Sequence, residues 1–252
     1  MRLWLLRHAT LRVDAGGLQL LVDPQLDSAG ARPPAADTAD PRRNPLVELP
    51  EPAQVAVQGV DAVLVTHLHS DHFDATAREL LPREVPVLCQ PADAGTLRGH
   101  GFTDVRPVQD AATLGRLSVA RTGGRHGTGE VGERMGPVSG YVLTASDELT
   151  LYVAGDTIWS EEVAAALTTH RPDVVVVNAG AARLTTGDPI TMDADDVVAV
   201  ARHAPDARIV AVHMEAVNHC ELTRADVHQR LHEEDLAERV TVPEDGAEVP
   251  LP

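Results

Sequence analysis

Four side chains able to bind a metal ion fall within six consecutive positions, His67, His69, Asp71 and His72. They directly follow the apolar run 62–65, whose length and β-branched content are typical of a buried strand. The group therefore follows the carboxyl end of a strand, where open α/β folds usually place their chemistry. Imidazoles and carboxylates suit zinc, and also manganese or iron when oxygen ligands are more numerous. This segment predicts the first half of a two-metal site.

Other apolar runs also end in polar side chains. Asp156, Asn178 and His213 each come at the end of such a run, as His67 does. Asp156 is the best placed to bridge two metals, because the two oxygens of a carboxylate can bind one ion each. His126 lies in the Gly-rich stretch 121–140, which predicts a loop that lets an imidazole approach the same place.

The segments between these residues predict alternating strands and helices. The first 23 residues favour a hairpin, and 85–88, 149–153, 174–177 and 209–212 favour strands. Four helices are expected after N-terminal caps, which are Asp74, Ser160, either Thr191 or Asp193, and Thr223 in a capping box with Asp226. This alternation predicts an α/β fold. The Pro-rich stretch 27–53 interrupts it and predicts a long loop that serves either as a lid or as a surface excursion.

The motif Thr66-His67-Leu68-His69-Ser70-Asp71-His72 resembles the signature of the metallo-β-lactamase fold superfamily. His126, Asp156 in Val-Ala-Gly-Asp-Thr, and His213 match its supporting residues. Within the superfamily the chain is most similar to the branch of ascorbate-phosphate lactonase and related metal-dependent hydrolases. That narrower resemblance lies in His8-Ala9-Thr10 and Leu21-Val22-Asp23-Pro24.

The resemblance implies a four-layer αββα sandwich formed by a single domain, residues 1–252. It implies a first metal ion held by three imidazoles, a second held by one carboxylate and two imidazoles, and a bridging Asp156. These sets are His67, His69 and His126, and then Asp71, His72 and His213. Two divalent ions are expected, zinc first, with manganese or iron as alternatives. A bridging hydroxide would attack an ester, lactone or phosphoester of a small molecule, and Asp71 would orient it or move its proton.

Several other residues are candidates for the surroundings of the metals. Three residues could orient the ligands through hydrogen bonds, His8, Asp23 and Asp61. The alternative is that His8 is an ordinary buried polar group and that the two aspartates are turn residues. Substrate contacts are expected from Asn178, Glu215 and His219, and from Arg42 and Arg43 if the excursion folds over the site. A solvated turn is the competing interpretation for the two arginines.

Composition limits the partners of the chain. The net charge is −17, and all 21 basic residues are arginine. This charge argues against a nucleic-acid groove and against a membrane surface. Two cysteines are too few for a disulfide framework. The amino terminus meets a charge too early for a signal peptide, so a cytoplasmic protein with a small-molecule substrate is expected. The oligomeric state cannot be derived from the sequence.

Two other functions compete with hydrolysis. The first is a di-iron redox enzyme of the same fold, which would need an electron donor from another protein. The second is a non-catalytic metal-binding module, which an open water position argues against because structural zinc sites are usually closed.

Overall fold

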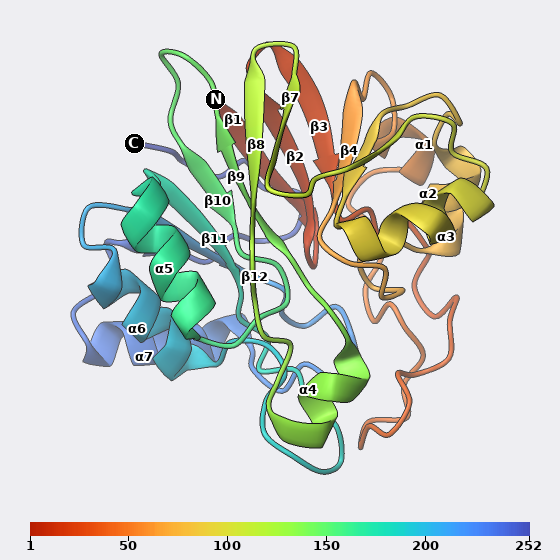
Figure 1. Cartoon of the computed structure of the whole chain (residues 1–252). Coiled ribbons are helices and arrows are strands. Elements are labelled where there is room, and N and C mark those ends of the chain that lie inside the picture. Colours follow the sequence, from red (N-terminus) through yellow and green to blue (C-terminus); the bar gives the residue numbers. More distant parts are fainter.

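Two β-sheets pack face to face, with helices on the outer face of each (Figure 1). The computed structural model describes all residues, 1–252. The first sheet has the order β1-β2-β3-β4-β5-β6. Its strands are β1 (Arg2–Arg7), β2 (Thr10–Ala15), β3 (Leu18–Val22), β4 (Ala62–Val65), β5 (Val87–Cys89) and β6 (Val105–Pro107). The pairs β1–β2 and β2–β3 are antiparallel, and the pairs from β3 to β6 are parallel.

The second sheet has the order β13-β12-β11-β10-β9-β8-β7. Its strands are β7 (Ala111–Leu114), β8 (Leu117–Thr122), β9 (Gly140–Thr144), β10 (Leu151–Val153), β11 (Val174–Asn178), β12 (Arg208–Val212) and β13 (Val240–Thr241). The strands from β7 to β10 pair antiparallel, and those from β10 to β13 pair parallel. Each sheet thus contains parallel strands whose carboxyl ends meet at one edge.

The helices form the two outer layers. On the first sheet lie α1 (Ala53–Ala56), α2 (Ala75–Leu80) and α3 (Ala94–Gly99), which a 3₁₀ turn, Pro91–Asp93, precedes. On the second sheet lie α5 (Glu161–His170), α6 (Ala194–His203) and α7 (Arg224–Glu233). A further short helix, α4 (Gly129–Met135), lies beyond the ends of the strands (Figure 1). No helix is long and apolar enough to cross a membrane.

Alternating side chains of the parallel strands bind the four layers together. In β11, Val174 and Val176 belong to the core between the sheets, while Val175 and Val177 belong to the core under the helices. Strand β4 divides its residues in the same way between the two cores of the first sheet. Successive residues of a strand point to opposite faces, so a continuous apolar run buries both. The predicted αββα sandwich is confirmed.

The predicted helix starts are largely confirmed. The side chains of Asp74, Ser160 and Asp193 accept backbone N–H groups at the starts of α2, α5 and α6, and Thr223 with Asp226 forms the capping box of α7. The hairpin expected in the first 23 residues is confirmed by β2 and β3, which pair antiparallel, and β1 adds a further strand to it. One expectation was wrong, because the expected loop 121–140 contains α4.

The excursion 27–53 has no helix or strand before α1, as expected, but many hydrogen bonds attach it to the rest of the chain. The buried guanidinium of Arg7 donates to the carbonyl oxygens of Gln25, Asp27 and Val47. At the far end of the excursion, the amide side chains of Asn44 and Asn218 are joined at 2.7 Å. Asn218 also bonds to Ala35, Thr38 and Asp40. The excursion therefore lies fixed beside the strand ends.

Candidate metal centre

The predicted metal ligands gather at the edge where the parallel strands of both sheets end. The loop after β4 carries the four ligands of residues 67–72, and Asp156 and His213 follow β10 and β12. His126 comes from the loop between β8 and α4. His213 adopts a left-handed backbone with φ of 72°, which turns the chain sharply at the end of β12. The structure thus brings all seven predicted ligands together from separate elements.

Asp156 lies at the centre of the group. Its Oδ2 is 3.2 Å from His72 Nε2, 3.6 Å from His126 Nε2 and 4.0 Å from His67 Nε2. Its Oδ1 is 3.2 Å from His213 Nε2. One carboxylate therefore faces imidazoles of both predicted sets, which is the arrangement that a bridging ligand requires.

The first set consists of three imidazoles. The ligand atoms of His67, His69 and His126 lie within 4.8 Å of one another. His126 Nδ1 donates to the carbonyl oxygen of Ile190 at 2.8 Å, which directs Nε2 to within 3.3 Å of His69 Nδ1. His67 Nε2 is buried and has no hydrogen-bond partner.

The second set contains Asp71, His72 and His213. His72 Nδ1 donates to Asp23 Oδ2 at 2.8 Å, which leaves its Nε2 free to face the cluster. His72 Nε2 and His213 Nε2 lie 3.3 Å apart. His213 Nδ1 lies 3.5 Å from Cys220 Sγ. Each imidazole of this set is thus approached on its outer nitrogen by another side chain, as metal-binding histidines usually are.

Burial and the mixture of charges shift the pKa values strongly. Burial lowers the pKa of His72, but Asp156, Asp23 and Asp71 overcome this effect and raise it to about 10. For His213, Asp156 and further partners likewise overcome burial, and its pKa lies well above the ordinary value. Burial raises the pKa of Asp156, but His213 and His72 hold it well below the ordinary range. Without metal, the chain therefore keeps ionised carboxylates beside protonated imidazoles.

These residues fit a metal ion by chemistry and by arrangement. Pairs of imidazole nitrogens face each other at 3.3 Å, and His67 Nε2 faces the same centre without a partner. A cation supplies what such inward-facing nitrogens and carboxylate oxygens lack. The donor set of imidazole and carboxylate suits zinc, manganese or iron. The cluster is able to bind metal.

Three predicted neighbours of the metals join the cluster. The Asp23 carboxylate accepts hydrogen bonds from the backbone and hydroxyl of Thr66 as well as from His72. His8 Nε2 lies 3.3 Å from Asp71 Oδ2. Asn178 was expected to contact substrate, but its amide donates to Asp156 Oδ1 at 2.6 Å, so it orients the central carboxylate.

Four predicted site residues lie elsewhere. Asp61 is at the opposite end of β4, where it accepts the backbone N–H of Gln19. Glu215 pairs with Arg224 at the start of α7. The exposed Arg42 pairs with Asp40, and Arg43 donates to the carbonyl oxygens of Gly30 and Ala31. The interpretation of the two arginines as part of a solvated turn fits these contacts better than substrate binding.

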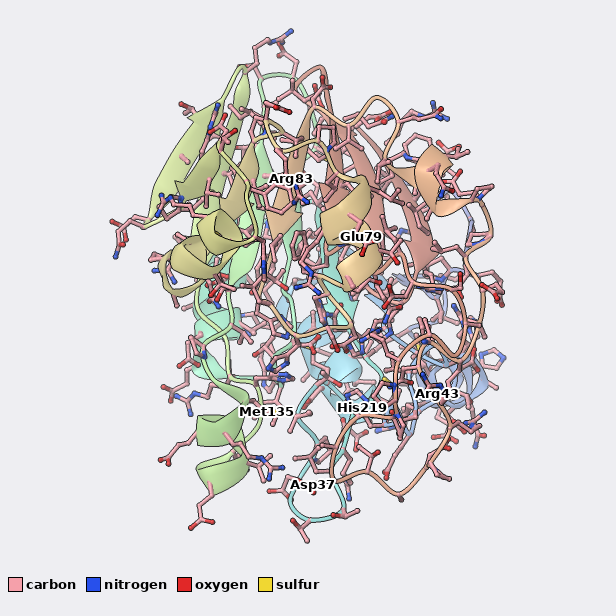
Figure 2. The ribbon with its side chains drawn as sticks, turned by 90° about the vertical axis from the view of Figure 1, so that its right-hand side faces the viewer. Asp37, Arg43, Glu79, Arg83, Met135 and His219 are labelled. Atoms are coloured by element: carbon pink, nitrogen blue, oxygen red, sulfur yellow. The ribbon has the colours of Figure 1, made fainter.

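A cavity of about 430 Å³ opens onto the cluster. Four residues of the cluster, His69, Asp71, His126 and Asp156, line it. The other lining residues come from four loops and α4, and they are Ala35, Ala36, Asp37, Ser70, Arg134, Met135, Leu184, Ile190 and His219. Figure 2 shows Met135, His219 and Asp37 in the lower half of the molecule, with Arg43 away to one side. A larger hollow of about 1010 Å³ lies beside Met1 and Glu148 and contains none of the clustered ligands.

The surroundings of the cluster contain two features that the sequence did not reveal. Leu184 and Ile190, from the segment between β11 and α6, form one wall of the cavity. In the sequence, this segment is marked only by the turn residues Gly187-Asp188-Pro189. Within the excursion, Arg32 is the arginine that reaches the loop after β4 and donates to Ser70 there. It also pairs with Asp27 of the excursion. No local pattern distinguishes it from Arg42 or Arg43.

The fold and the cluster define a metal-dependent hydrolase of the metallo-β-lactamase fold. A model of the β-lactamase superfamily domain matches residues 19–214. UPF0173 protein YddR of Bacillus subtilis (strain 168) is 36% identical over 98% of both chains. A UPF0173 metal-dependent hydrolase of Azorhizobium caulinodans is 30% identical over 71% of this chain and 73% of its own. The chain belongs to this family of metal-dependent hydrolases.

A solved structure is similar over the whole length. The crystal structure of isothiocyanate hydrolase from Delia radicum gut bacteria is 35% identical, with a TM-score of 0.95, and covers 100% of this chain and 99% of its own. These comparisons confirm the superfamily and the hydrolase class. They do not name the ascorbate-phosphate lactonase branch, which stays a prediction.

Proposed function

We propose that the chain holds two divalent metal ions and hydrolyses a small uncharged electrophile, with isothiocyanates as the first class to test. The observation that carries the proposal is the cavity of about 430 Å³, whose lining includes four residues of the metal-binding cluster. In this proposal, residues 1–252 form one domain and the substrate is a free small molecule in the cytoplasm. Neither nucleic acid nor a membrane takes part.

The cluster divides into two positions that share Asp156. His67, His69 and His126 would hold the first ion, and Asp71, His72 and His213 the second. Zinc is the first expectation, and manganese or iron are the alternatives. When bound, the two ions supply Lewis acidity, which makes water a nucleophile near neutral pH and polarises the bond that it attacks.

The walls of the cavity favour a substrate with an apolar substituent and no net charge. Ala35, Ala36, Met135, Leu184 and Ile190 provide apolar surface around the opening. The one arginine in the wall, Arg134, pairs with Asp37 at 3.1 Å, and both side chains are more than half exposed. With a net charge of −17, the chain offers no attraction at long range to a phosphoester.

The similarity to an isothiocyanate hydrolase supports one chemistry for this cavity. Water adds to the central carbon of R–N=C=S, forming a C–O bond while the nitrogen takes up a proton. The C–N bond then breaks with its electron pair remaining on nitrogen, which takes up the proton of the newly added hydroxyl group, and the products are R–NH₂ and O=C=S. Esters and lactones present a similar electrophilic carbon and are the second substrate class that the site would suit.

Two side chains of the cavity would act on the water and the substrate. Burial raises the pKa of Asp71, but His72, His213 and His8 hold it well below the ordinary range. Asp71 therefore stays ionised and would accept a hydrogen bond from the attacking water. Burial lowers the pKa of His219, so its neutral imidazole would donate one hydrogen bond to the substrate.

The proposal is tested by hydrolysis of a benzyl isothiocyanate, measured as the amount of amine released. The assay compares the metal-loaded wild type with Asp156→Ala. We expect one amine per isothiocyanate consumed by the wild type, and loss of both activity and bound metal in the variant. Asp61→Ala is the control, because it also removes a carboxylate beside a strand, but at the end of β4 that lies away from the cluster. Undiminished hydrolysis by Asp156→Ala would refute the site, whereas hydrolysis of lactones alone would refute the substrate class.

A further inference from the structure

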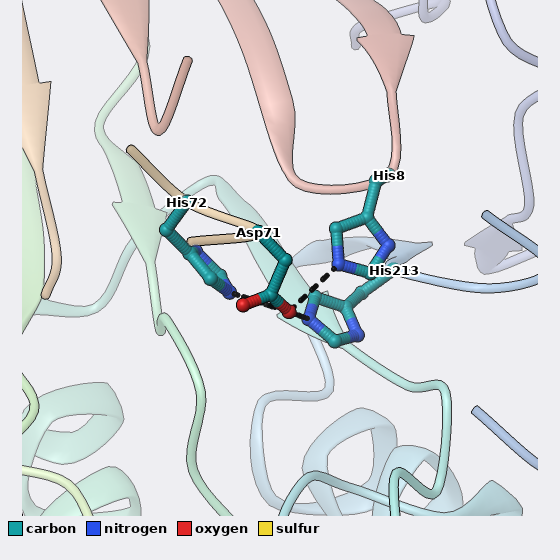
Figure 3. A group of neighbouring side chains, drawn as sticks. All are labelled: His8, Asp71, His72 and His213. Atoms are coloured by element: carbon teal, nitrogen blue, oxygen red, sulfur yellow. Dashed lines mark hydrogen bonds and ion pairs between the residues drawn. The ribbon is translucent and has the colours of Figure 1, made fainter. Parts of the chain in front are cut away.

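His8 lies in the tight turn between β1 and β2, and its fully buried side chain faces the second set of ligands (Figure 3). His8 Nε2 is 3.3 Å from Asp71 Oδ2. The Nε2 atoms of His213 and His72 are 3.7 Å and 3.8 Å from the same oxygen. The ligand atoms of these four residues all lie within 4.8 Å of one another.

The backbone joins His8 to His213 directly. The His213 N–H donates to the His8 carbonyl oxygen at 2.9 Å. The two rings lie close, with centroids 3.6 Å apart and an interplanar angle of 36°. Both residues adopt left-handed backbones, with φ of 61° and 72°. This conformation costs about 1–2 kcal/mol for a residue other than glycine, and such costs are typically retained where the side chain has a function.

Hydrogen bonding alone does not account for the convergence of three imidazoles. A carboxylate oxygen offers about two lone-pair sites, yet the Nε2 atoms of three histidines surround Asp71 Oδ2. One cation among these atoms would satisfy the three nitrogens and the oxygen together. His8 Nδ1 is buried and has no partner, so no competing contact directs the ring elsewhere.

We propose that His8 is an eighth protein ligand of the metal centre and binds through Nε2 the ion held by Asp71, His72 and His213. Each of the two ions then has three imidazoles, and the two share Asp156. This assignment rests on the two-ion centre proposed above. The alternative is that His8 only donates a hydrogen bond to Asp71 and orients it.

Magnetic resonance of the cadmium-loaded protein distinguishes these arrangements without any measurement of activity. The chain is labelled with ¹⁵N in its histidines and loaded with ¹¹³Cd, and the imidazole nitrogens that show a one-bond coupling to cadmium are counted. We expect six coupled nitrogens, from His8, His72 and His213 and from the three histidines of the first set. Five coupled nitrogens with two bound ions would overturn the assignment of His8 alone. One ion coupled only to the three histidines of the first set would overturn both the assignment of His8 and the two-ion centre.

Two variants confirm which residue is responsible. His8→Asn and His8→Gly introduce residues that tolerate a φ of 61°, so the turn is expected to fold in both. In each, the count falls to five, and the affinity for the second ion falls about tenfold or more, while that for the first is retained. His219→Asn removes a cavity histidine outside the cluster and should keep all six. A count that His8→Asn leaves unchanged would refute the assignment.

Discussion

Replacing Asp23 by asparagine tests how the protein fixes the proton of a metal-binding imidazole. Asp23 Oδ2 accepts the Nδ1–H of His72 at 2.8 Å, so Nε2 carries the lone pair that a metal needs. Asp23 Oδ1 accepts the Thr66 N–H at 2.8 Å, and asparagine can keep that bond through its own oxygen. Its amide then faces His72 Nδ1 and donates to it, which moves the imidazole proton to Nε2. The substitution is thus nearly isosteric but favours the wrong tautomer.

The expected cost falls on one metal position. Loss of an orienting partner typically weakens metal binding about 10–100-fold, which is about 1.4–2.8 kcal/mol. His72 belongs to the second set, so the first ion should bind to Asp23→Asn as it does to the wild type. Titration of zinc against a chromophoric chelator measures both affinities. Asp61→Asn is the control, because Asp61 bonds only to Gln19. Two unchanged affinities in Asp23→Asn would refute the argument that Asp23 fixes the tautomer of His72.

Three further predictions follow from the contacts of the site and from one helix start. The raised pKa values keep His72 and His213 protonated at pH 7, and metal binding needs both neutral, so loading should release about two protons and tighten as pH rises. Calorimetry in buffers of different ionisation enthalpy measures the number of protons released. If no protons were released on metal binding, the two histidines would not be protonated in the metal-free chain. Asn218→Ala removes the bonds that hold the excursion, so KM for an isothiocyanate should rise about tenfold with metal content unchanged; an unchanged KM would contradict a wall fixed by Asn218. Thr223→Ala loses the capping box of α7 and should lower the free energy of unfolding by about 1 kcal/mol in denaturant titrations, with no effect on metal binding.

Much of the fold could be predicted because the parallel strands are apolar on both faces. Runs such as 62–65 and 174–177 are strongly apolar and short, and each proved to be a buried strand. Strand β7 was missed because its four residues are partly or fully exposed and carry no clear pattern. The turn at His8 was missed because it contains no glycine, the residue that usually marks a left-handed backbone.

The metal ligands were predictable for a different reason. A motif concentrates four of them within residues 67–72, and strand ends supply most of the rest. Contacts that depend on long-range packing were not predictable. The sequence places Asn178 after its strand and Asp61 before its own, but it does not show that the Asn178 amide donates to Asp156 or that Asp61 bonds to Gln19. Which arginine of the excursion approaches the loop after β4 depends on the folded structure. Arg32 does so, because it pairs with Asp27 and donates to Ser70.

The central claim is that hydrolysis needs two ions held around Asp156. Adding zinc back to the metal-free chain, while bound metal and amine release from a benzyl isothiocyanate are followed together, tests it most directly. The account predicts that two equivalents bind and that activity rises only as the second position fills. Full activity at one equivalent, or in the metal-free chain, would contradict it.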